Sequence, residues 1–141
     1  MTHSWHVQSI EKLQQIALEL LTFFPTPRIF AFEGEMGAGK TTFITYLLHQ
    51  LGIQEIEGSP TYSIINEYLN PSGIKIYHLD CYRIADRHEV LNLGLDELLD
   101  EKAYFFIEWA EKIDFILPSD VIWVYIRNND IDSSREISFQ V

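Results

Sequence analysis

Residues 34 to 41 have the residue types and spacing of a loop that holds phosphate groups. The run Gly34-Glu35-Met36-Gly37-Ala38-Gly39-Lys40-Thr41 fits the pattern G-x-x-x-x-G-K-[ST]. Glycines let the backbone turn so that its N–H groups point inward at an anion, and the lysine adds a positive charge. The chemistry that this run indicates is the binding of nucleotide phosphates in a P-loop.

Individual residues of the loop have distinct expected roles. We expect Lys40 to reach the β- and γ-phosphates, Thr41 to offer its hydroxyl to Mg²⁺, and Thr42 to hydrogen-bond the α-phosphate. The other residues expected to contact the nucleotide are Glu35, Met36, Gly37, Ala38 and Gly39. The sequence contains no Asn-Lys-x-Asp segment, which reads guanine in GTPases. It therefore favours ATP with Mg²⁺ as the ligand.

A P-loop also needs an acidic residue at the end of a neighbouring strand, to hold the metal ion or its water. Asp80 follows residues 74–79 and Glu108 follows residues 104–107, and both segments are predicted strands. Two acids suggest two roles, one near the metal ion and one that orients or activates the attacking water. The residues alone leave open which acid has which role.

The P-loop lies between a predicted strand and a predicted helix, which is the context that the motif requires. Residues 29–32 form a short apolar strand, and residues 41–51 form a helix with an apolar face and Gly52 at its end. An earlier helix is predicted over residues 9–21, with Ser9 as its N-cap. These elements would fix the loop against a sheet.

The rest of the chain predicts a sheet with both parallel and antiparallel pairing. Residues 70–73, Asn-Pro-Ser-Gly, have strong turn chemistry and would join two strands into a hairpin, and a polar helix broken near Gly94 is predicted over residues 86–99. The predicted strands after the P-loop helix are residues 63–69, 74–79, 104–107, 121–126 and 137–141. We predict an α/β, P-loop NTPase fold in one domain, residues 1–141, with a mixed sheet of about six or seven strands flanked by helices.

The chain is strongly acidic. Its 21 acidic and 10 basic residues give a formal net charge of −11, and the basic residues are scattered singly. Proteins that bind nucleic acid usually neutralise its phosphates with clustered Lys and Arg. We therefore expect any role in a nucleic-acid pathway to be exerted through a protein partner.

Composition also bears on location. No apolar run approaches the roughly 20 residues of a membrane-spanning helix, and the first residues show no secretion signal. The one cysteine, Cys81, cannot form an internal disulfide, which is compatible with a reducing compartment. We expect a cytoplasmic protein that does not contact a membrane.

Three further segments accompany the P-loop in a fixed order. They are Ser59-Pro60-Thr61-Tyr62, His78-Leu79-Asp80-Cys81-Tyr82-Arg83 and Ile107-Glu108-Trp109. In order and spacing, and over residues 29–118, the four segments resemble the TsaE family (older name YjeE), with its Ser-Pro-Thr-aromatic, His-x-Asp-x-Tyr-Arg and Ile-Glu-Trp motifs. One departure is Glu35-Met36, where the family usually has Asp-Leu; the glycines and the lysine are kept.

The resemblance implies a function that the residues alone would not give. TsaE proteins are small bacterial ATPases required for the threonylcarbamoyladenosine (t6A) modification of tRNA, and they act on a complex of TsaD and TsaB. The resemblance implies that this chain hydrolyses ATP on that complex, slowly by itself and faster with its partners. It also implies that the chain acts on tRNA only indirectly.

The resemblance and the loop chemistry together assign roles to single residues. Lys40 would bind the phosphates, Thr41 and Glu108 would hold Mg²⁺, and Asp80 would lie near the attacking water. The alternative exchanges the two acids. Thr61 lies after the P-loop helix, where nucleotide hydrolases have switch loops, and would contact the γ-phosphate or Mg²⁺.

Three neighbouring residues have ordinary structural interpretations. His78 is expected to make a hydrogen bond at the end of its strand, because two candidate ligands without a third are weak evidence for a metal site. Trp109 is expected to pack like other tryptophans, near the nucleotide or a partner surface at most. Cys81 is expected to be a small buried residue.

Two other functions fit parts of the sequence. A small-molecule kinase would share the P-loop but needs a basic lid, for which Arg83 and Arg87 are the available pair. A nucleotide-gated interaction module would bind ATP and switch residues 59–62 with negligible hydrolysis. The presence of both Asp80 and Glu108 argues against this module.

Overall fold

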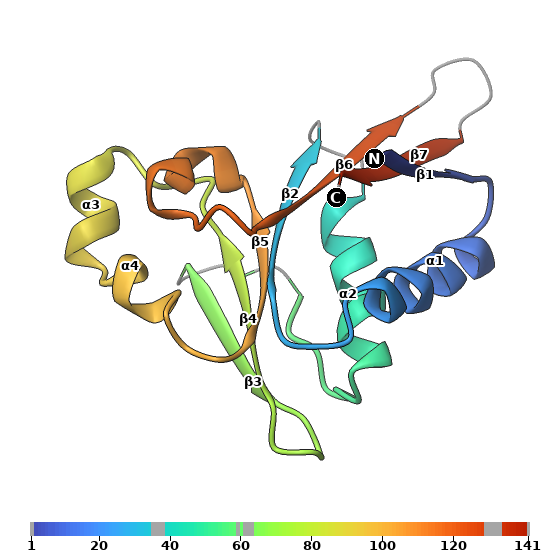
Figure 1. Ribbon diagram of the computed structural model, residues 1–141, viewed down its shortest axis with the longest axis horizontal. Helices are drawn as coiled ribbons and strands as arrows, with labels where there is room; N and C mark the ends of the chain where they lie inside the picture. Colours follow the sequence, from blue (N-terminus) through green and yellow to red (C-terminus); the bar gives the residue numbers. More distant parts are fainter. Residues whose placement is uncertain (1, 35–38, 59, 61–63, 129–133, 141) are drawn as a thin grey trace.

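The protein, seen here in a computed structural model, is built on one mixed β-sheet with helices on both faces (Figure 1). The structure describes residues 2–34, 39–58, 60, 64–128 and 134–140. The sheet that these residues form has seven strands in the order β1-β7-β6-β2-β5-β4-β3. The strands are β1 (Thr2–Val7), β2 (Ile29–Gly34), β3 (Ile65–Leu69), β4 (Lys75–Asp80), β5 (Tyr104–Glu108), β6 (Ile122–Asn128) and β7 (Arg135–Gln140).

The four central strands, β6, β2, β5 and β4, run parallel to one another. Their carboxyl ends therefore meet at one edge of the sheet, which is where ligands bind in open α/β sheets. Antiparallel strands complete the sheet, β3 beside β4 on one side and β7 with β1 beside β6 on the other. The mixed, helix-flanked sheet confirms the predicted fold class.

Helices cover the two faces of the sheet separately. Helices α1 (Ile10–Phe23) and α2 (Lys40–Gln50) pack on one face, and α3 (Arg87–Asn92), α4 (Leu95–Leu98) and the 3-10 helix Ala110–Ile116 lie on the other (Figure 1). Successive residues of a strand point to opposite faces. In β2, Phe30 and Phe32 accordingly pack toward α1 and α2, whereas Ala31 belongs to the opposite core.

The ends of α1 and α2 follow from single residues. The hydroxyl oxygen of Ser9 accepts a hydrogen bond from the Lys12 backbone N–H at 3.2 Å, so the predicted N-cap of α1 is confirmed. Helix α2 begins after Gly39, whose φ of +94° is the left-handed conformation that glycine adopts most readily. Gly52, with φ of +97°, ends the helix as predicted.

Several elements differ from the sequence-based expectation. Strand β1 and the 3-10 helix were not predicted. Strand β1 brings the number of strands in the described sheet to seven and lies at one edge of the sheet. The predicted break of the helical stretch 86–99 near Gly94 is confirmed: the stretch forms two short helices, and φ of Gly94 is +72°. Within the described ranges, every helix is too short or too polar to cross a membrane.

Candidate functional site

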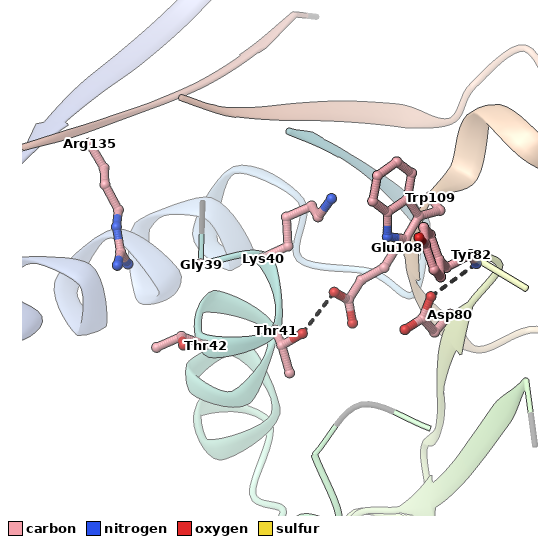
Figure 2. Close-up of a pocket in the computed structure, with 9 residues that line it drawn as sticks. All are labelled: Gly39, Lys40, Thr41, Thr42, Asp80, Tyr82, Glu108, Trp109 and Arg135. Atoms are coloured by element: carbon pink, nitrogen blue, oxygen red, sulfur yellow. Dashed lines mark hydrogen bonds between the residues drawn. The ribbon is translucent and has the colours of Figure 1, made fainter. Parts of the chain in front are cut away.

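A pocket of about 420 Å³ opens at the carboxyl ends of the parallel strands, beside the first turn of α2 (Figure 2). Its walls come from α2, β7 and the ends of β4 and β5. The lining residues are Gly39, Lys40, Thr41, Thr42, Asp80, Tyr82, Glu108, Trp109 and Arg135. Residues far apart in the sequence therefore converge at the start of the helix that follows the P-loop.

Lys40 is the first residue of α2 and is buried, with 6% of its surface exposed. Its ammonium donates a hydrogen bond to the carbonyl oxygen of Gly34 at 2.7 Å and lies 4.1 Å from the ring centroid of Trp109. The carbonyl and the aromatic face stabilise a charge that would be costly to bury alone. The hydrogen bond to Gly34 uses one of three N–H donors, so the ammonium retains donors for an anion.

Glu108, the last residue of β5, is a buried carboxylate held at both of its oxygens. Its Oε1 accepts a hydrogen bond from the Thr41 hydroxyl at 2.8 Å, and its Oε2 lies 2.7 Å from Nε2 of His78 (Figure 2 shows the bond to Thr41). A hydroxyl and a carboxylate are hard oxygen ligands of the kind Mg²⁺ prefers. The pair predicted to hold the metal ion is thus brought into contact, and its chemistry fits Mg²⁺.

His78 explains the fixed orientation of Glu108. The ring is 1% exposed, and within the described part of the chain its Nδ1 has no hydrogen-bond partner. An unpartnered N–H in the core costs more than an unpartnered lone pair, so we assign the ring proton to Nε2, which donates to Glu108. The predicted hydrogen bond of His78 is confirmed; among the described residues no group of three His, Cys, Asp or Glu is arranged to bind a metal.

Asp80 is the neighbour of Glu108 in the sheet. The two residues are paired in the parallel β4–β5 register, so their side chains leave the sheet at the same edge. Asp80 is half-buried, and its Oδ1 accepts a hydrogen bond from the Tyr82 backbone N–H at 3.1 Å. The carboxylate thereby faces the pocket while the chain turns away from β4.

Trp109 forms the wall of the pocket next to Lys40. Its φ of +56° is the left-handed conformation that residues other than glycine rarely adopt. Its ring packs on the ring of Tyr82, with centroids 5.0 Å apart, as well as on the Lys40 ammonium. The expectation of ordinary packing for Trp109 is therefore incomplete, because the ring contacts the cation of the site.

The six predicted site residues that lie within the described part of the chain all line this one pocket. They are Gly39, Lys40, Thr41, Thr42, Asp80 and Glu108. Glu35, Met36, Gly37, Ala38 and Thr61 lie outside the described residues. Three lining residues had no predicted role in the site. Tyr82 and Trp109 belong to the His-x-Asp-x-Tyr-Arg and Ile-Glu-Trp segments, and that membership was a usable signal; Arg135 lies in a segment without a motif.

The strand–loop–helix unit, with a lysine opening the helix and two acids on neighbouring parallel strands, defines a protein of the P-loop NTPase fold. The family model for "Threonylcarbamoyl adenosine biosynthesis protein TsaE" matches residues 7–137. The chain belongs to the TsaE family, in agreement with the resemblance of its motifs.

Individual relatives agree with this assignment. The tRNA threonylcarbamoyladenosine biosynthesis protein TsaE of Bacillus subtilis is 37% identical over 135 residues, covering 96% of this chain and 83% of the relative. The protein of the same name from Haemophilus influenzae is 42% identical over 104 residues, covering 74% of this chain and 64% of the relative. The crystal structure of Bacillus subtilis YdiB superposes with a TM-score of 0.78 at 33% identity, covering 99% of this chain and 84% of that one.

Proposed function

We propose that this protein binds and hydrolyses ATP with Mg²⁺, and that it does so as an accessory ATPase of the machinery that makes t6A in tRNA. The observation that carries the proposal is the convergence of Lys40 with the hydrogen-bonded pair Thr41–Glu108 at the start of α2. The family supports the pathway, because the descriptions of its model and its members specify threonylcarbamoyladenosine biosynthesis.

Binding of the phosphates would rest on three positive features of the pocket. Lys40 supplies a full charge, and the start of α2 supplies unpaired backbone N–H groups and the positive end of the helix dipole. Thr41 and Glu108 would hold Mg²⁺, with its remaining positions filled by phosphate oxygens and water. Mg²⁺ bound there would neutralise charge on the phosphate oxygens.

Hydrolysis would need a water molecule aligned with the terminal phosphate. Asp80 would orient that water, which attacks the γ-phosphorus while the bond to the departing ADP oxygen breaks. Thr61 would contact the γ-phosphate or Mg²⁺ and release after hydrolysis. Exchange of the roles of Asp80 and Glu108 is the alternative, but Glu108 is the acid that contacts the Thr41 hydroxyl.

The acidity of the chain favours action through a protein. The chain has a net charge of −11 and scattered basic residues, so it would repel tRNA rather than bind it. We propose that the partners are the TsaD and TsaB proteins, and that they complete a catalytic arrangement that is slow in the isolated chain. The proposed compartment is the cytoplasm.

The kinase alternative is less well supported. Of the two arginines available for a lid, Arg87 stacks on the ring of Phe115, with its guanidinium carbon 4.7 Å from the centroid. Arg83 does not line the pocket. A kinase would also need an acceptor, and its ADP formation would depend on adding one particular small molecule.

The direct test is ATP hydrolysis by the purified protein, alone and with the TsaD and TsaB proteins of the same organism. We expect slow turnover that the partners stimulate and that Lys40→Ala abolishes. Lys75→Ala is the matched control, because it removes an equal charge at the opposite end of β4 from Asp80. Unchanged turnover in Lys40→Ala would refute the site, and tight ATP binding without stimulated turnover would favour the nucleotide-gated module.

A further inference from the structure

Arg135 brings a second basic side chain to the pocket, from a strand that no motif marks. It is the first residue of β7, where it is paired with Asn128 of β6 and Val7 of β1. Its guanidinium lies against Gly39, the residue before α2: a Cβ atom built on Gly39 would come within 2.9 Å of the Arg135 Cζ. The side chain is half-buried and lines the pocket together with Thr42.

The Arg135 guanidinium adds a positive charge to the side of the pocket that lies away from the two acids. It lies at the amino end of α2, where the helix dipole is positive, and it shares the pocket with Lys40. The ion pairs found among the described residues do not include Arg135, although the chain carries 21 acids. A positive side chain beside the amino end of a helix favours the binding of an anion there.

The pocket has two ends, and Arg135 lies at the end away from the acids. Figure 2 shows Arg135 on one side of Gly39 and Thr42, with Glu108 and Asp80 beyond Lys40 on the other side. If Mg²⁺ binds at Thr41 and Glu108, the terminal phosphates lie toward those acids. The phosphate that carries the nucleoside then lies toward Thr42 and Arg135.

We propose that Arg135 binds the α-phosphate of the nucleotide, and so fixes the nucleoside end of the phosphate chain at the amino end of α2. The inference rests on the proposed ATP-binding function and adds a binding residue to it. A guanidinium suits the role because its planar fork donates two parallel hydrogen bonds to phosphate oxygens, which an ammonium cannot do. Gly39 suits it because the guanidinium can lie directly against the glycine backbone, beside the first turn of α2.

The test is the affinity of Arg135→Ala and Arg135→Lys for ATP, ADP and AMP, measured by calorimetry in the presence of Mg²⁺. Loss of charge-assisted hydrogen bonds should raise the Kd in Arg135→Ala by about 10- to 100-fold. The increase should be equal for ATP and ADP, which share the α- and β-phosphates, and it should persist for AMP, which carries the α-phosphate alone; an unchanged Kd for AMP would place the contact at the β-phosphate. Arg135→Lys keeps the positive charge but lacks the planar guanidinium, so its Kd should lie between those of the wild type and Arg135→Ala. An increase for ATP alone would place the contact at the γ-phosphate, and no increase would remove Arg135 from the site; any of these results overturns the proposal.

Thermal unfolding separates this role from a structural one. Because the ion pairs found among the described residues do not include Arg135, Arg135→Ala without nucleotide should melt close to the wild type, while the rise in Tm on adding ATP should shrink. A lower Tm without nucleotide, with an unchanged rise on adding ATP, would show a structural residue and overturn the proposal. Lys75→Ala, which removes the same charge elsewhere, should bind both nucleotides like the wild type.

The same measurements distinguish failure of this inference from failure of the proposed function. If the wild type binds no ATP, or Lys40→Ala binds it equally well, the ATP site itself is wrong. If the wild type binds ATP, Lys40→Ala does not, and Arg135→Ala binds like the wild type, only the role of Arg135 is wrong.

Discussion

The Nε2 atom of His78 lies 2.7 Å from Oε2 of Glu108, and both side chains are buried. The two residues are 30 positions apart and come from adjacent parallel strands. With the Thr41 hydroxyl on the other oxygen, the contact holds the Glu108 carboxylate from two sides. His78 therefore positions a residue of the proposed metal site without itself lining the pocket.

Removing the N–H donor of His78 should destabilise the fold even when the substituted side chain fills a similar volume. His78→Leu fills the core with an apolar side chain but leaves Oε2 of Glu108 buried without this donor, which should lower the free energy of unfolding by about 1–3 kcal/mol. His78→Gln retains a side-chain N–H donor and should lose less. Urea unfolding of both variants checks this, and equal losses would show that the hydrogen bond is not the cause.

Substitutions of the two acids of the pocket should impair ATP turnover in different ways. In Glu108→Gln the ligand charge opposite Thr41 is lost, so the Mg²⁺ concentration needed for half-maximal ATP turnover should rise at least tenfold. In Asp80→Asn the Mg²⁺ requirement should stay near that of the wild type while kcat falls by about 100-fold or more, the range of general-base catalysis. Mg²⁺ titrations of steady-state turnover measure both quantities. The reverse pattern would exchange the roles of the two residues.

Trp109 offers a test of backbone conformation. At φ of +56° a residue with a Cβ atom costs about 1 kcal/mol more than glycine, so Trp109→Gly should be more stable than Trp109→Ala by about that amount. Both variants lose the ring contacts with Tyr82 and Lys40, so the comparison isolates the backbone. Chemical denaturation of the pair measures the difference. At positions with negative φ a glycine variant is less stable than the alanine variant. A Trp109→Gly protein less stable than Trp109→Ala would contradict the prediction.

The elements that the sequence predicted are those whose determinants are local. The turn at residues 70–73 is an example: Oδ1 of Asn70 accepts hydrogen bonds from the backbone N–H groups of Ser72 and Ile74, at 3.0 and 2.8 Å. Ser9 likewise caps α1 by accepting a hydrogen bond from the backbone N–H of Lys12, three residues along the chain. Strand 104–107 was predicted because a strand buried on both faces is apolar throughout, as β5 is.

The features that escaped prediction depend on distant partners. Strand β1 alternates polar residues with His3 and Trp5, and its partner β7 begins more than 120 positions later. The inner face of β1 gains its core from residues distant in sequence, such as Phe139, on which both rings pack. Arg135 has no motif around it and reaches the pocket because β7 places it there. The P-loop lysine and both acids were predictable, since their spacing relative to strand ends is part of the motif.

Cys81 should make stability fall at alkaline pH. The thiol is fully buried, and burial, with Asp80 and Glu111 nearby, raises its pKa from 9.0 to about 12. Between those values the unfolded chain releases a proton that the folded chain retains, so the free energy of unfolding decreases as the pH rises above 9. From pH 8 to pH 10 this residue should contribute a loss of about 1.4 kcal/mol, since one pKa unit corresponds to that energy.

The comparison of wild type with Cys81→Ala isolates this contribution from that of other groups. Tyr77, whose pKa burial and Glu101 raise to about 12, titrates in the same direction but is common to both proteins. Urea unfolding under reducing conditions at pH 8 and pH 10 should therefore show a smaller loss in Cys81→Ala than in the wild type, by about 1.4 kcal/mol. Equal losses would mean that the thiolate is tolerated in the folded protein, and that the core around Cys81 admits water or a positive charge.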